Sequence, residues 1–513
     1  MEIKVLLVTS RSISFQLETD DNFFLKKELT LKYNGKEQRL TKVVNSIYDL
    51  EPNTEYILEI FKENIKVTDI KVTTDMESFT LNVKRFGAKG DGIHNDTLAI
   101  QSAIMACPQD GRVYIPRGKY LITSIFLKDN LTLELGDGVE LLGDTTRENF
   151  GILPGLIDND NNDEYYLGSW EGNPLDSFTS LITGINVKNV KVIGRGTLNG
   201  NGSKENWWNE PKIKKIAWRP RSIFLNNCEN VVIEGIEIKN SPSWTIHPFL
   251  TNNLRFINLK IKNPADSPNT DGIDPESCEN VEYIGIDFSV GDDCIAIKSG
   301  KLYLGRVLNK PSKNFYIKHC SMKYGHGGVV IGSEMSGGVE NVHIEKCDFY
   351  KTDKGIRIKT RRGRGENGVI DGIYAENISM NEVKVPFVIN CFYFCDPDGK
   401  TEYVYTKEKL PVDERTPSIK NIEFKNIKAE NTKICAGYLY GLPEKPIENV
   451  KFKDVEIDFT KEEVTPEVPA MMSFIEEEAK TGLFIKNVEG ISLENLEIKN
   501  NIGEKIRGEI KWD

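Results

Sequence analysis

The chain has 513 residues, enough for one large domain together with a smaller one. Its formal net charge of −11 argues against a general nucleic-acid-binding protein, which would carry a dominant basic surface. The sequence has no apolar stretch of about 18 residues, so we expect no helix that spans a membrane.

The first residues, Met1–Phe15, combine a short apolar run with polar residues and lack the pattern of a signal peptide. We therefore expect a cytoplasmic protein. The nine cysteines agree with this compartment, because their count is odd and four of them stand beside repeated strand-like runs. These four are Cys228, Cys278, Cys320 and Cys347. With five histidines and no CxxC motif, the sequence predicts no zinc site and no cofactor.

Residues 1–80 alternate apolar and polar positions in short runs, such as Ile13–Leu17 and Leu29–Tyr33, with turn residues between them. This pattern is typical of a small antiparallel β-sandwich. The segment Leu50–Tyr56 resembles the corner before a late strand of fibronectin type III domains, where a tyrosine hydroxyl ties the corner to nearby backbone. We predict a fibronectin type III-like module over residues 1–80, with a binding or spacing role.

The pattern changes beyond residue 81. Phe86–Gly92 is a glycine-rich loop, but it lacks the GK[ST] ending of a phosphate-binding loop. Asp96 and Thr97 then resemble the cap of a helix, because the apolar residues of Leu98–Ile104 are spaced for one helical face. We expect this helix to close the open apolar end of the domain that follows.

The remainder of the chain is repetitive. Asparagine followed by an apolar residue recurs at intervals that are commonly about 23 to 28 residues, with longer intervals where loops intrude. The repeated asparagines are Asn189, Asn230, Asn253, Asn280, Asn314, Asn341, Asn421, Asn449 and Asn487. Several short strands per repeat predict an all-β solenoid, a parallel β-helix over residues 81–513. Its turns stack about 4.8 Å apart, so equivalent residues form ladders, and we expect the asparagines to hydrogen-bond along one.

Four short polar clusters stand beside apolar strand-like runs in the middle of the chain. They are Asn269–Asp271, Gly291–Asp293, Gly325–Gly327 and Arg357–Lys359, each about one coil from the next. Stacked coils would bring three carboxylates, an imidazole and two cations to one wall, over a length on the order of 15 Å. Such a set predicts acid/base cleavage of an acidic polymer.

The adjacent Asp292 and Asp293 would face opposite ways in an ideal strand, but Gly291 permits a bend that turns both into the same cleft. Carboxylates this close cannot all ionise easily, so we expect one to have a raised pKa and to serve as general acid. A second, ionised carboxylate can activate water. Separations of about 6.5–9.5 Å would leave room for that water and give inversion at the sugar carbon.

A cation cluster follows within a few residues: Arg357, Lys359, Arg361, Arg362 and Arg364. Beside catalytic acids, in an otherwise acidic protein, it predicts a substrate that carries carboxylates. A solvated surface run is the alternative for the last three of these arginines.

Other candidates are less specific. His247, with Trp244 beside it, lies one coil before Asp271 and is predicted to line the groove, although a buried core histidine is an equal alternative. Glu334 is a candidate ligand for substrate hydroxyl groups. Asn269 fits a structural ladder better than a catalytic role, although it adjoins the site.

The four ordered clusters resemble those of the polygalacturonase family, glycoside hydrolase family 28, whose members fold as right-handed parallel β-helices. The resemblance extends from about Asn82 to the C-terminal region. It implies that Asp292 is the general acid and that Asp271 with Asp293 holds the attacking water. His326 would then tune the acid or hold the substrate.

The same resemblance implies that Arg357 and Lys359 bind a galacturonate carboxylate. An N-terminal fibronectin-like module resembles certain bacterial exo-acting members of the family. The expected partner is therefore a pectic oligosaccharide.

Long insertions at about 144–180, 201–221 and 391–416 interrupt the repeat. The first two carry Tyr165, Tyr166, Trp170, Trp207, Trp208 and Trp218. Aromatic faces stack on sugars, and such loops can wall off one end of a groove, so we expect exo-cleavage of α-1,4-linked galacturonate from the non-reducing end. The alternatives are a rhamnogalacturonan or xylogalacturonan hydrolase, a pectate lyase, and a noncatalytic carbohydrate-binding solenoid.

Overall fold

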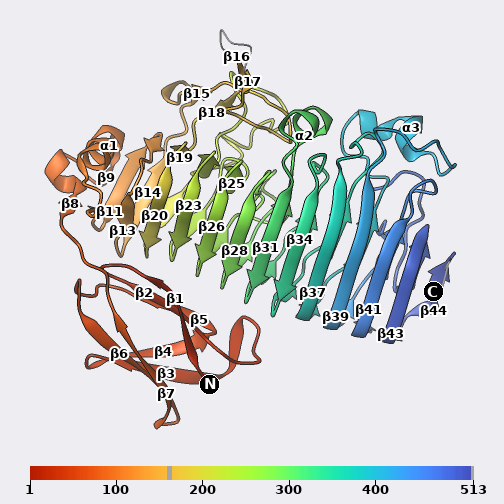
Figure 1. Ribbon diagram of the computed structural model, residues 1–513, viewed down its shortest axis with the longest axis horizontal. Coiled ribbons are helices and arrows are strands. Elements are labelled where there is room, and N and C mark those ends of the chain that lie inside the picture. The colour runs from red at the N-terminus through yellow and green to blue at the C-terminus, as the bar shows by residue number, and fades with distance from the viewer. Residues whose placement is uncertain (159–163, 510–513) are drawn as a thin grey trace.

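The computed structural model describes residues 1–158 and 164–509, so residues 159–163 of the first expected insertion lie outside the described residues. A long parallel β-helix follows a small antiparallel sandwich, which lies beside its coils and contacts them as far as Asp348 (Figure 1). None of the helices in the described part of the chain is long and apolar enough to cross a membrane.

The N-terminal module consists of two antiparallel sheets with strand orders β1-β2-β5 and β4-β3-β6-β7. Its strands are β1 Ile3–Val8, β2 Ile13–Leu17, β3 Phe24–Tyr33, β4 Lys36–Lys42, β5 Val44–Ile47, β6 Glu55–Lys62 and β7 Ile65–Thr73. The backbone N–H of Glu51 donates to the hydroxyl of Tyr56 at 2.8 Å, which is the tyrosine corner expected from the sequence. The fibronectin type III-like sandwich is therefore present.

The module is attached to the β-helix by a buried contact. Leu7 and Val44 pack with Ile193 and Ile257 of the coils, in a cluster separate from the main core. The buried carboxylate of Glu234 accepts three hydrogen bonds from the module. The donors are the hydroxyl groups of Ser14 at 2.8 Å, Ser46 at 2.6 Å and Tyr48 at 2.7 Å.

One continuous sheet of 22 strands forms two sides of the coils, and its ladder pairings are parallel throughout. Its strands are β8 Thr80–Asn82, β9 Asp91–Asn95, β10 Arg112–Ile115, β11 Gly118–Ile122, β13 Thr132–Leu135, β14 Val139–Gly143, β20 Lys188–Gly194, β21 Thr197–Asn199, β23 Glu229–Glu234, β24 Glu237–Lys239, β26 Asn252–Ile257, β27 Lys260–Lys262, β28 Glu279–Ile284, β29 Asp287–Ser289, β31 Ser312–Lys318, β32 Ser321–Lys323, β34 Val339–Glu345, β35 Asp348–Tyr350, β37 Val369–Asn381, β39 Ser418–Thr432, β41 Ile447–Phe459 and β43 Val488–Lys499. Each strand pairs with its counterpart one coil later, as the repeat predicts.

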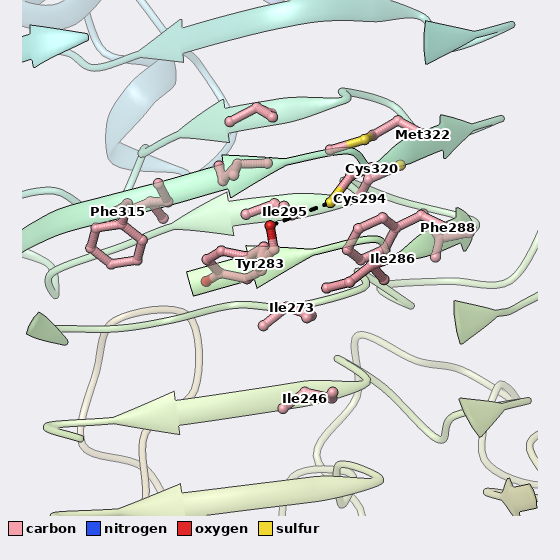
Figure 2. Packing of buried hydrophobic residues seen from close by; sticks show 14 of the residues in the cluster. Ile246, Ile273, Tyr283, Ile286, Phe288, Cys294, Ile295, Phe315, Cys320 and Met322 are labelled. Atoms are coloured by element: carbon pink, nitrogen blue, oxygen red, sulfur yellow. Dashed lines mark hydrogen bonds between the residues drawn. The ribbon is translucent and has the colours of Figure 1, made fainter. Parts of the chain in front are cut away.

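Two shorter parallel sheets form the remaining side, which we call the site wall. Its strands are β12 Ile125–Phe126, β19 Ile182–Ile185, β22 Ile223–Asn226, β25 Ile246–Phe249, β30 Ile295–Ile297, β33 Val329–Ile331, β36 Lys354–Lys359, β38 Val385–Asn390, β40 Cys435–Tyr440, β42 Thr481–Lys486 and β44 Ile502–Gly508. Isolated bridges through Ile273 join β25 to β30 and make the wall continuous. Figure 2 shows Ile246, Ile273 and Ile295 on successive coils, with their side chains in the shared core.

The loops and helices between the coils gather along one edge of the β-helix (Figure 1). They contain the short strands β15 Ile152–Leu153, β16 Ile157–Asp158, β17 Glu164–Tyr165 and β18 Ser177–Phe178 and the helices α2 Leu302–Leu308 and α3 Glu402–Tyr405. Single 3₁₀ turns occur at η1 Val83–Phe86, η2 Arg147–Asn149 and η3 Asp398–Lys400.

The predicted helix is α1, Thr97–Ala106, and it covers the N-terminal end of the solenoid core with Ile100 and Ile104 buried. The role of Asp96 differs from the prediction, because its side chain makes no hydrogen bond to the helix. Its carboxylate instead accepts the backbone N–H of Lys89 at 2.6 Å and of Gly90 at 2.9 Å. The glycine-rich loop thus folds onto the cap residue.

The asparagine ladder expected from the repeat is present. Side-chain amides donate to the side-chain oxygen one coil before, as in Asn314 to Asn280 at 3.0 Å and Asn341 to Asn314 at 2.8 Å. Two of the repeated asparagines differ, because Asn421 donates to Asp371 and Asn487 to the backbone carbonyl of Gly441. Asn280, Asn314 and Asn341 have positive φ, between 56° and 61°, a conformation that asparagine tolerates better than most residues. The asparagines therefore both form the turns and link them.

The cysteines that were expected to act as small hydrophobes, Cys228, Cys278, Cys320 and Cys347, are buried and free.

Candidate active site

Parallel pairing of the coils aligns two of the predicted aspartates. Ile273 pairs with Ile295, which places Asp271 beside Asp293, two residues earlier on each coil. The backbone N–H of Gly272 donates to the Asp293 carbonyl at 2.9 Å and fixes this register. The two side chains consequently occupy equivalent positions on neighbouring coils of the site wall, as the sequence predicted.

A bend directly after each aspartate turns its side chain outward. Gly272 and Ile273 both face the core, because a Cβ on Gly272 would lie 2.7 Å from Phe288 there. On the next coil Cys294 and Ile295 are likewise both buried in the core. In a regular strand each aspartate would point inward, like the isoleucine two positions later. The bend therefore directs the acid toward the outer face of the wall.

The third aspartate joins this pair. One carboxylate oxygen from each of Asp271, Asp292 and Asp293 lies within 4.8 Å of the others. Gly291 permits the turn, since a Cβ there would lie 2.4 Å from the carbonyl oxygen of Ser267. The prediction that a bend at Gly291 brings the adjacent aspartates together is therefore confirmed.

These oxygens are closer than the predicted separation of about 6.5–9.5 Å. A single water molecule still bridges two oxygens up to 4.8 Å apart, because each of its hydrogen bonds spans about 2.7–2.8 Å.

Asp293 is held ionised by two cations. Its Oδ2 lies 2.9 Å from Nζ of Lys359, and its Oδ1 lies 3.5 Å from a terminal nitrogen of Arg357. Burial alone would raise the pKa of Asp293, but Lys359 and Arg357 hold it below its usual range. Three carboxylates this close could also hold a metal ion, although Asp293 already has its charge balanced by these two side chains.

Asp271 has the opposite environment. Burial raises the pKa of Asp271 well above its usual range, and the carboxylates of Asp274 and Asp292 add to the effect. Burial also raises the pKa of Asp274 to about 8, against the attraction of Lys298, whose Nζ lies 3.5 Å from its Oδ1. A carboxyl group with a raised pKa is thus present, but it is Asp271, to which the resemblance assigned the holding of water and not the role of general acid. Asp274 and Lys298 were not predicted, although they adjoin the predicted clusters in sequence.

Asp292 and His326 form the part of the site that faces solvent. The ring Nδ1 of His326 lies 3.3 Å from Oδ1 of Asp292, and the two side chains are 54% and 24% exposed. The hydrogen bond to Asp292 raises the pKa of His326. The backbone N–H of Asp293 donates to the same Asp292 oxygen at 3.0 Å. The predicted imidazole therefore contacts the predicted acid.

An aromatic ring supports the two cations. Arg357 and Lys359 lie 5.6 Å and 5.2 Å from the ring centroid of Tyr393. Arg357 also contacts the sulfur of Met471 at 3.0 Å. Tyr393 and Met471 come from loops well beyond the β36 strand, and no spacing rule in the sequence pointed to either.

Arg361 and Arg362 do not take the predicted substrate-binding role. Arg361 pairs with Asp396 at 2.8 Å, and Arg362 pairs with Glu444 at 2.6 Å. Both guanidinium groups are almost fully buried, as is the carboxylate of Glu444. A third arginine, Arg364, donates to the carbonyl oxygen of Ser333 at 2.6 Å. These arginines fix the loops beside the site and are unavailable to a substrate.

His247 and Asn269, two further predicted site residues, have structural roles. His247 is fully buried, and its Nε2 lies 3.0 Å from Glu276; burial lowers its pKa to about 4, so the core-histidine alternative holds. Asn269 accepts a hydrogen bond from Arg219 at 2.8 Å.

Glu334, just after β33 of the site wall, is nearly buried. Its Oε2 lies 3.3 Å from Nζ of Lys298. Burial alone would raise the pKa of Glu334, but Lys298, Lys301 and Lys359 hold it below its usual range. Glu334 is thus an ionised member of a charge network that reaches Lys359.

Trp244 marks the N-terminal limit of the exposed wall. The backbone N–H after it, on Thr245, donates to the Asp271 carbonyl at 2.9 Å, so Trp244 precedes Asp271 by one coil at the same position. The ring of Trp170 stacks on it at 5.5 Å and 14°, and Trp218 stacks on the other face of Trp170 at 5.2 Å and 4°. The two insertions that supply Trp170 and Trp218 therefore cover the wall one coil before the carboxylates.

Comparison with known proteins agrees with this geometry. The family model described as glycosyl hydrolases family 28 matches residues 112–473. A probable polygalacturonase of Vitis vinifera is 31% identical over 380 residues, which cover 72% of this chain and 73% of the relative. An exo-poly-alpha-D-galacturonosidase of Dickeya chrysanthemi is 26% identical over 413 residues, covering 71% and 65% respectively.

Two solved structures share the fold. The hyperthermoactive exopolygalacturonase from Thermotoga maritima superimposes with a TM-score of 0.66 and 25% identity, covering 82% of this chain and 92% of that one. The family 28 exopolygalacturonase of Yersinia enterocolitica gives 0.71 and 19%, covering 100% and 96%. The aligned carboxylates on a parallel β-helix, together with these matches, show that this chain belongs to glycosyl hydrolases family 28, the polygalacturonase family.

Proposed function

We propose that this protein is an inverting exo-polygalacturonase that hydrolyses α-1,4-galacturonosidic bonds from the non-reducing end of pectic oligosaccharides. The observation that carries the proposal is the carboxylate cluster of Asp271, Asp292 and Asp293, with the cations of Arg357 and Lys359 on one side and a covered wall on the other. The names of the relatives support the substrate class, and the Dickeya chrysanthemi relative and the two solved structures are named as exo-acting.

Asp292 is the proposed general acid, because it is the most exposed of the three carboxyl groups and contacts His326. It donates a proton to the glycosidic oxygen as the bond from that oxygen to the anomeric carbon breaks. A water molecule held between Asp271 and Asp293 attacks the same carbon from the opposite face. Its proton passes to Asp293, which Lys359 keeps ionised. Inversion follows because the water attacks in a single displacement.

The substrate class follows from the cations. Arg357 and Lys359 are nearly buried beside the acids, so their attraction for a carboxylate is screened less than at an open surface. The two also balance the charge of Asp293, which keeps them in position before substrate arrives. We propose that they bind the carboxylate of the galacturonate unit next to the cleaved bond.

The exo assignment rests on the stacked tryptophans. Trp244 lies one coil, roughly 4.8 Å, before Asp271, and Trp170 covers it. Little wall is left exposed on this side of the acids, which supports the entry of a single terminal sugar. We place the remainder of the oligosaccharide on the C-terminal side of the acids, past Arg357 and Lys359.

Substitution of Asp292 by asparagine tests the catalytic proposal. Release of reducing sugar from trigalacturonate should fall by at least about a hundredfold, the lower end of the range for loss of a general acid. Asp371→Asn, on the 22-stranded sheet, is the matched control and should keep wild-type activity. Hydrolysis near the wild-type rate by the Asp292→Asn enzyme would refute the assignment.

The same reaction separates the alternatives. Absorbance near 235 nm from an unsaturated product would indicate a lyase, and proton NMR of the first-formed anomer reports inversion or retention. Higher activity on rhamnogalacturonan or xylogalacturonan than on polygalacturonate would indicate that the enzyme is a hydrolase of that other pectic polymer. Binding without turnover on any of these polymers would favour a noncatalytic solenoid.

The direction of attack is tested with tetragalacturonate labelled at its reducing end. Cleavage from the non-reducing end should release unlabelled monomer first and leave a labelled trimer. Early labelled dimer or monomer would contradict the proposal. Residence in the cytoplasm also remains a proposal, and fractionation of cells that express the protein tests it.

A further inference from the structure

A lysine outside the predicted clusters occupies the same position on the site wall as the catalytic acids. The backbone N–H of Lys354 donates to the carbonyl of His326 at 3.2 Å, and its carbonyl accepts from Gly328 at 3.0 Å. Lys354 therefore lies beside Gly327, which in turn lies beside Asp293 on the preceding coil. The lysine is two coils beyond Asp293, a distance on the order of 10 Å along the wall.

The bend that turns the aspartates outward is repeated at this coil. A Cβ on Gly355 would lie 2.8 Å from the sulfur of Met380 in the core, so Gly355 faces inward and Lys354 faces outward. On the coil between, a Cβ on Gly327 would lie 3.1 Å from Oδ1 of Asp293, so this position also faces outward but carries no side chain. Gly327 therefore places no side chain of its own between Asp293 and Lys354, and the side chains of Val330 and Arg357 border this position.

Lys354 is a buried cation without an acidic partner. The residue is only 9% exposed, and no carboxylate oxygen of a described residue lies within 4 Å of its ammonium group. The neighbouring acids are already used, because Lys384 pairs with Asp353 at 3.1 Å and with Glu467 at 2.8 Å. An unpaired buried charge is unfavourable, so this position is incomplete without an anion from outside the protein.

The surroundings make the ammonium group responsive to such an anion. Burial lowers the pKa of Lys354 to about 8, and the nearby cations of Arg357 and Lys384 add to the effect, while Asp353 and Glu467 oppose it only in part. A carboxylate placed against the ammonium would oppose burial and the cations and raise the pKa again.

We propose that Lys354 binds the carboxylate of a second galacturonate unit on the leaving-group side of the cleaved bond, beyond the unit held by Arg357 and Lys359. The assignment rests on the proposed function, because the covered end at Trp244 leaves only the C-terminal direction for the departing chain. Lys354 shares its coil with Arg357 and Lys359, but those two side chains reach back to the carboxylate of Asp293 at 3.5 Å and 2.9 Å, whereas the ammonium group of Lys354 makes no such contact.

Binding is measured by calorimetry in the Asp292→Asn background, where substrate persists. Replacing Lys354 by methionine should weaken trigalacturonate binding by roughly ten- to a hundredfold and leave digalacturonate, which is too short to reach it, unchanged. Lys354→Arg keeps the charge and should stay within about threefold. Lys425→Met, in an exposed ion pair on the opposite sheet, is the control for a lost positive charge.

Two further measurements identify the carboxylate as the ligand. The methyl-esterified trimer should bind equally well to the Asp292→Asn enzyme and to the enzyme that carries Lys354→Met in addition. Near pH 8, binding of trigalacturonate should take up a proton in the enzyme that retains Lys354, seen as a heat that depends on the buffer, and less in Lys354→Met.

The outcomes are separable. Equal loss of digalacturonate and trigalacturonate affinity in Lys354→Met, or no loss of either, would overturn the assignment of Lys354 and leave the proposed function intact. Failure of the enzyme with an intact Asp292 to hydrolyse trigalacturonate would instead overturn the proposed function, whatever Lys354 does.

Discussion

Replacement of Lys359 by methionine tests whether its ammonium group keeps Asp293 ionised. The two groups are 2.9 Å apart, and their side chains are 8% and 2% exposed. Removing one partner of a buried ion pair typically costs about 3–5 kcal/mol, because the other charge stays buried. Arg357 remains 3.5 Å from Asp293 and offsets part of this cost, so we expect the free energy of unfolding to fall by about 3 kcal/mol near neutral pH.

The direction of the pH effect follows from the lowered pKa of Asp293. A lowered folded-state pKa stabilises the protein above the unfolded value of about 3.9, and that stability is lost as the pH falls through the folded value. Without Lys359, burial is less well opposed and the pKa of Asp293 rises. Because the proposed base must be ionised, the acid limb of kcat/KM should move to higher pH. Each pH unit by which the acid limb moves corresponds to about 1.4 kcal/mol less stabilisation of the ionised form of Asp293 relative to its protonated form.

The assay is the pH profile of kcat/KM on trigalacturonate, together with urea denaturation at neutral and acidic pH. Lys425→Met serves again as the control for a lost positive charge. The difference in stability between Lys359→Met and wild type should narrow as the pH falls, because the unpaired Asp293 takes up a proton. An acid limb that stays in place, with unchanged stability, would refute the ion-pair reasoning.

Three other substitutions probe separate features. Arg362→Met breaks a pair buried on both sides with Glu444, so urea denaturation should show a loss of about 3–5 kcal/mol, and unchanged stability would contradict its structural role. Trp170→Ala removes the ring that covers the N-terminal wall, so chromatography of products from labelled hexagalacturonate should reveal internal cleavage; exclusively terminal cleavage would count against the closed end. Asp274→Asn removes a charge that raises the pKa of Asp271. An alkaline limb of kcat/KM that reflects ionisation of Asp271 should then move to lower pH. A limb that does not move would show that it does not report on Asp271.

The alignment of Asp271 with Asp293 was predictable because a solenoid converts sequence period into spatial register. Each coil places equivalent residues about 4.8 Å apart, so polar clusters one coil apart must lie together on the wall. The asparagine ladder followed from the same rule. The corner tyrosine, Tyr56, was predictable for a different reason, since its partner Glu51 is only five residues away.

The fate of the arginine run was not predictable from spacing. Arg361 and Arg362 looked like Arg357 and Lys359 in sequence, and only their partners distinguish them. Asp396, the partner of Arg361, comes from the insertion at about 391–416, and Glu444 lies in a turn 82 residues after Arg362. Insertions do not follow the repeat, so the period carries no information about where their acids are placed.

The column that contains the acids explains how an acidic protein can accept an acidic polymer. From the N-terminal side it presents a covered tryptophan, two acids, a glycine and a lysine, at the equivalent positions Trp244, Asp271, Asp293, Gly327 and Lys354. Neither acid repels substrate as a free charge would, because the raised pKa of Asp271 favours its neutral form and Asp293 is paired with buried cations. The local charge that a polyanion meets is therefore set by these few side chains, and the net charge of −11 resides elsewhere on the surface.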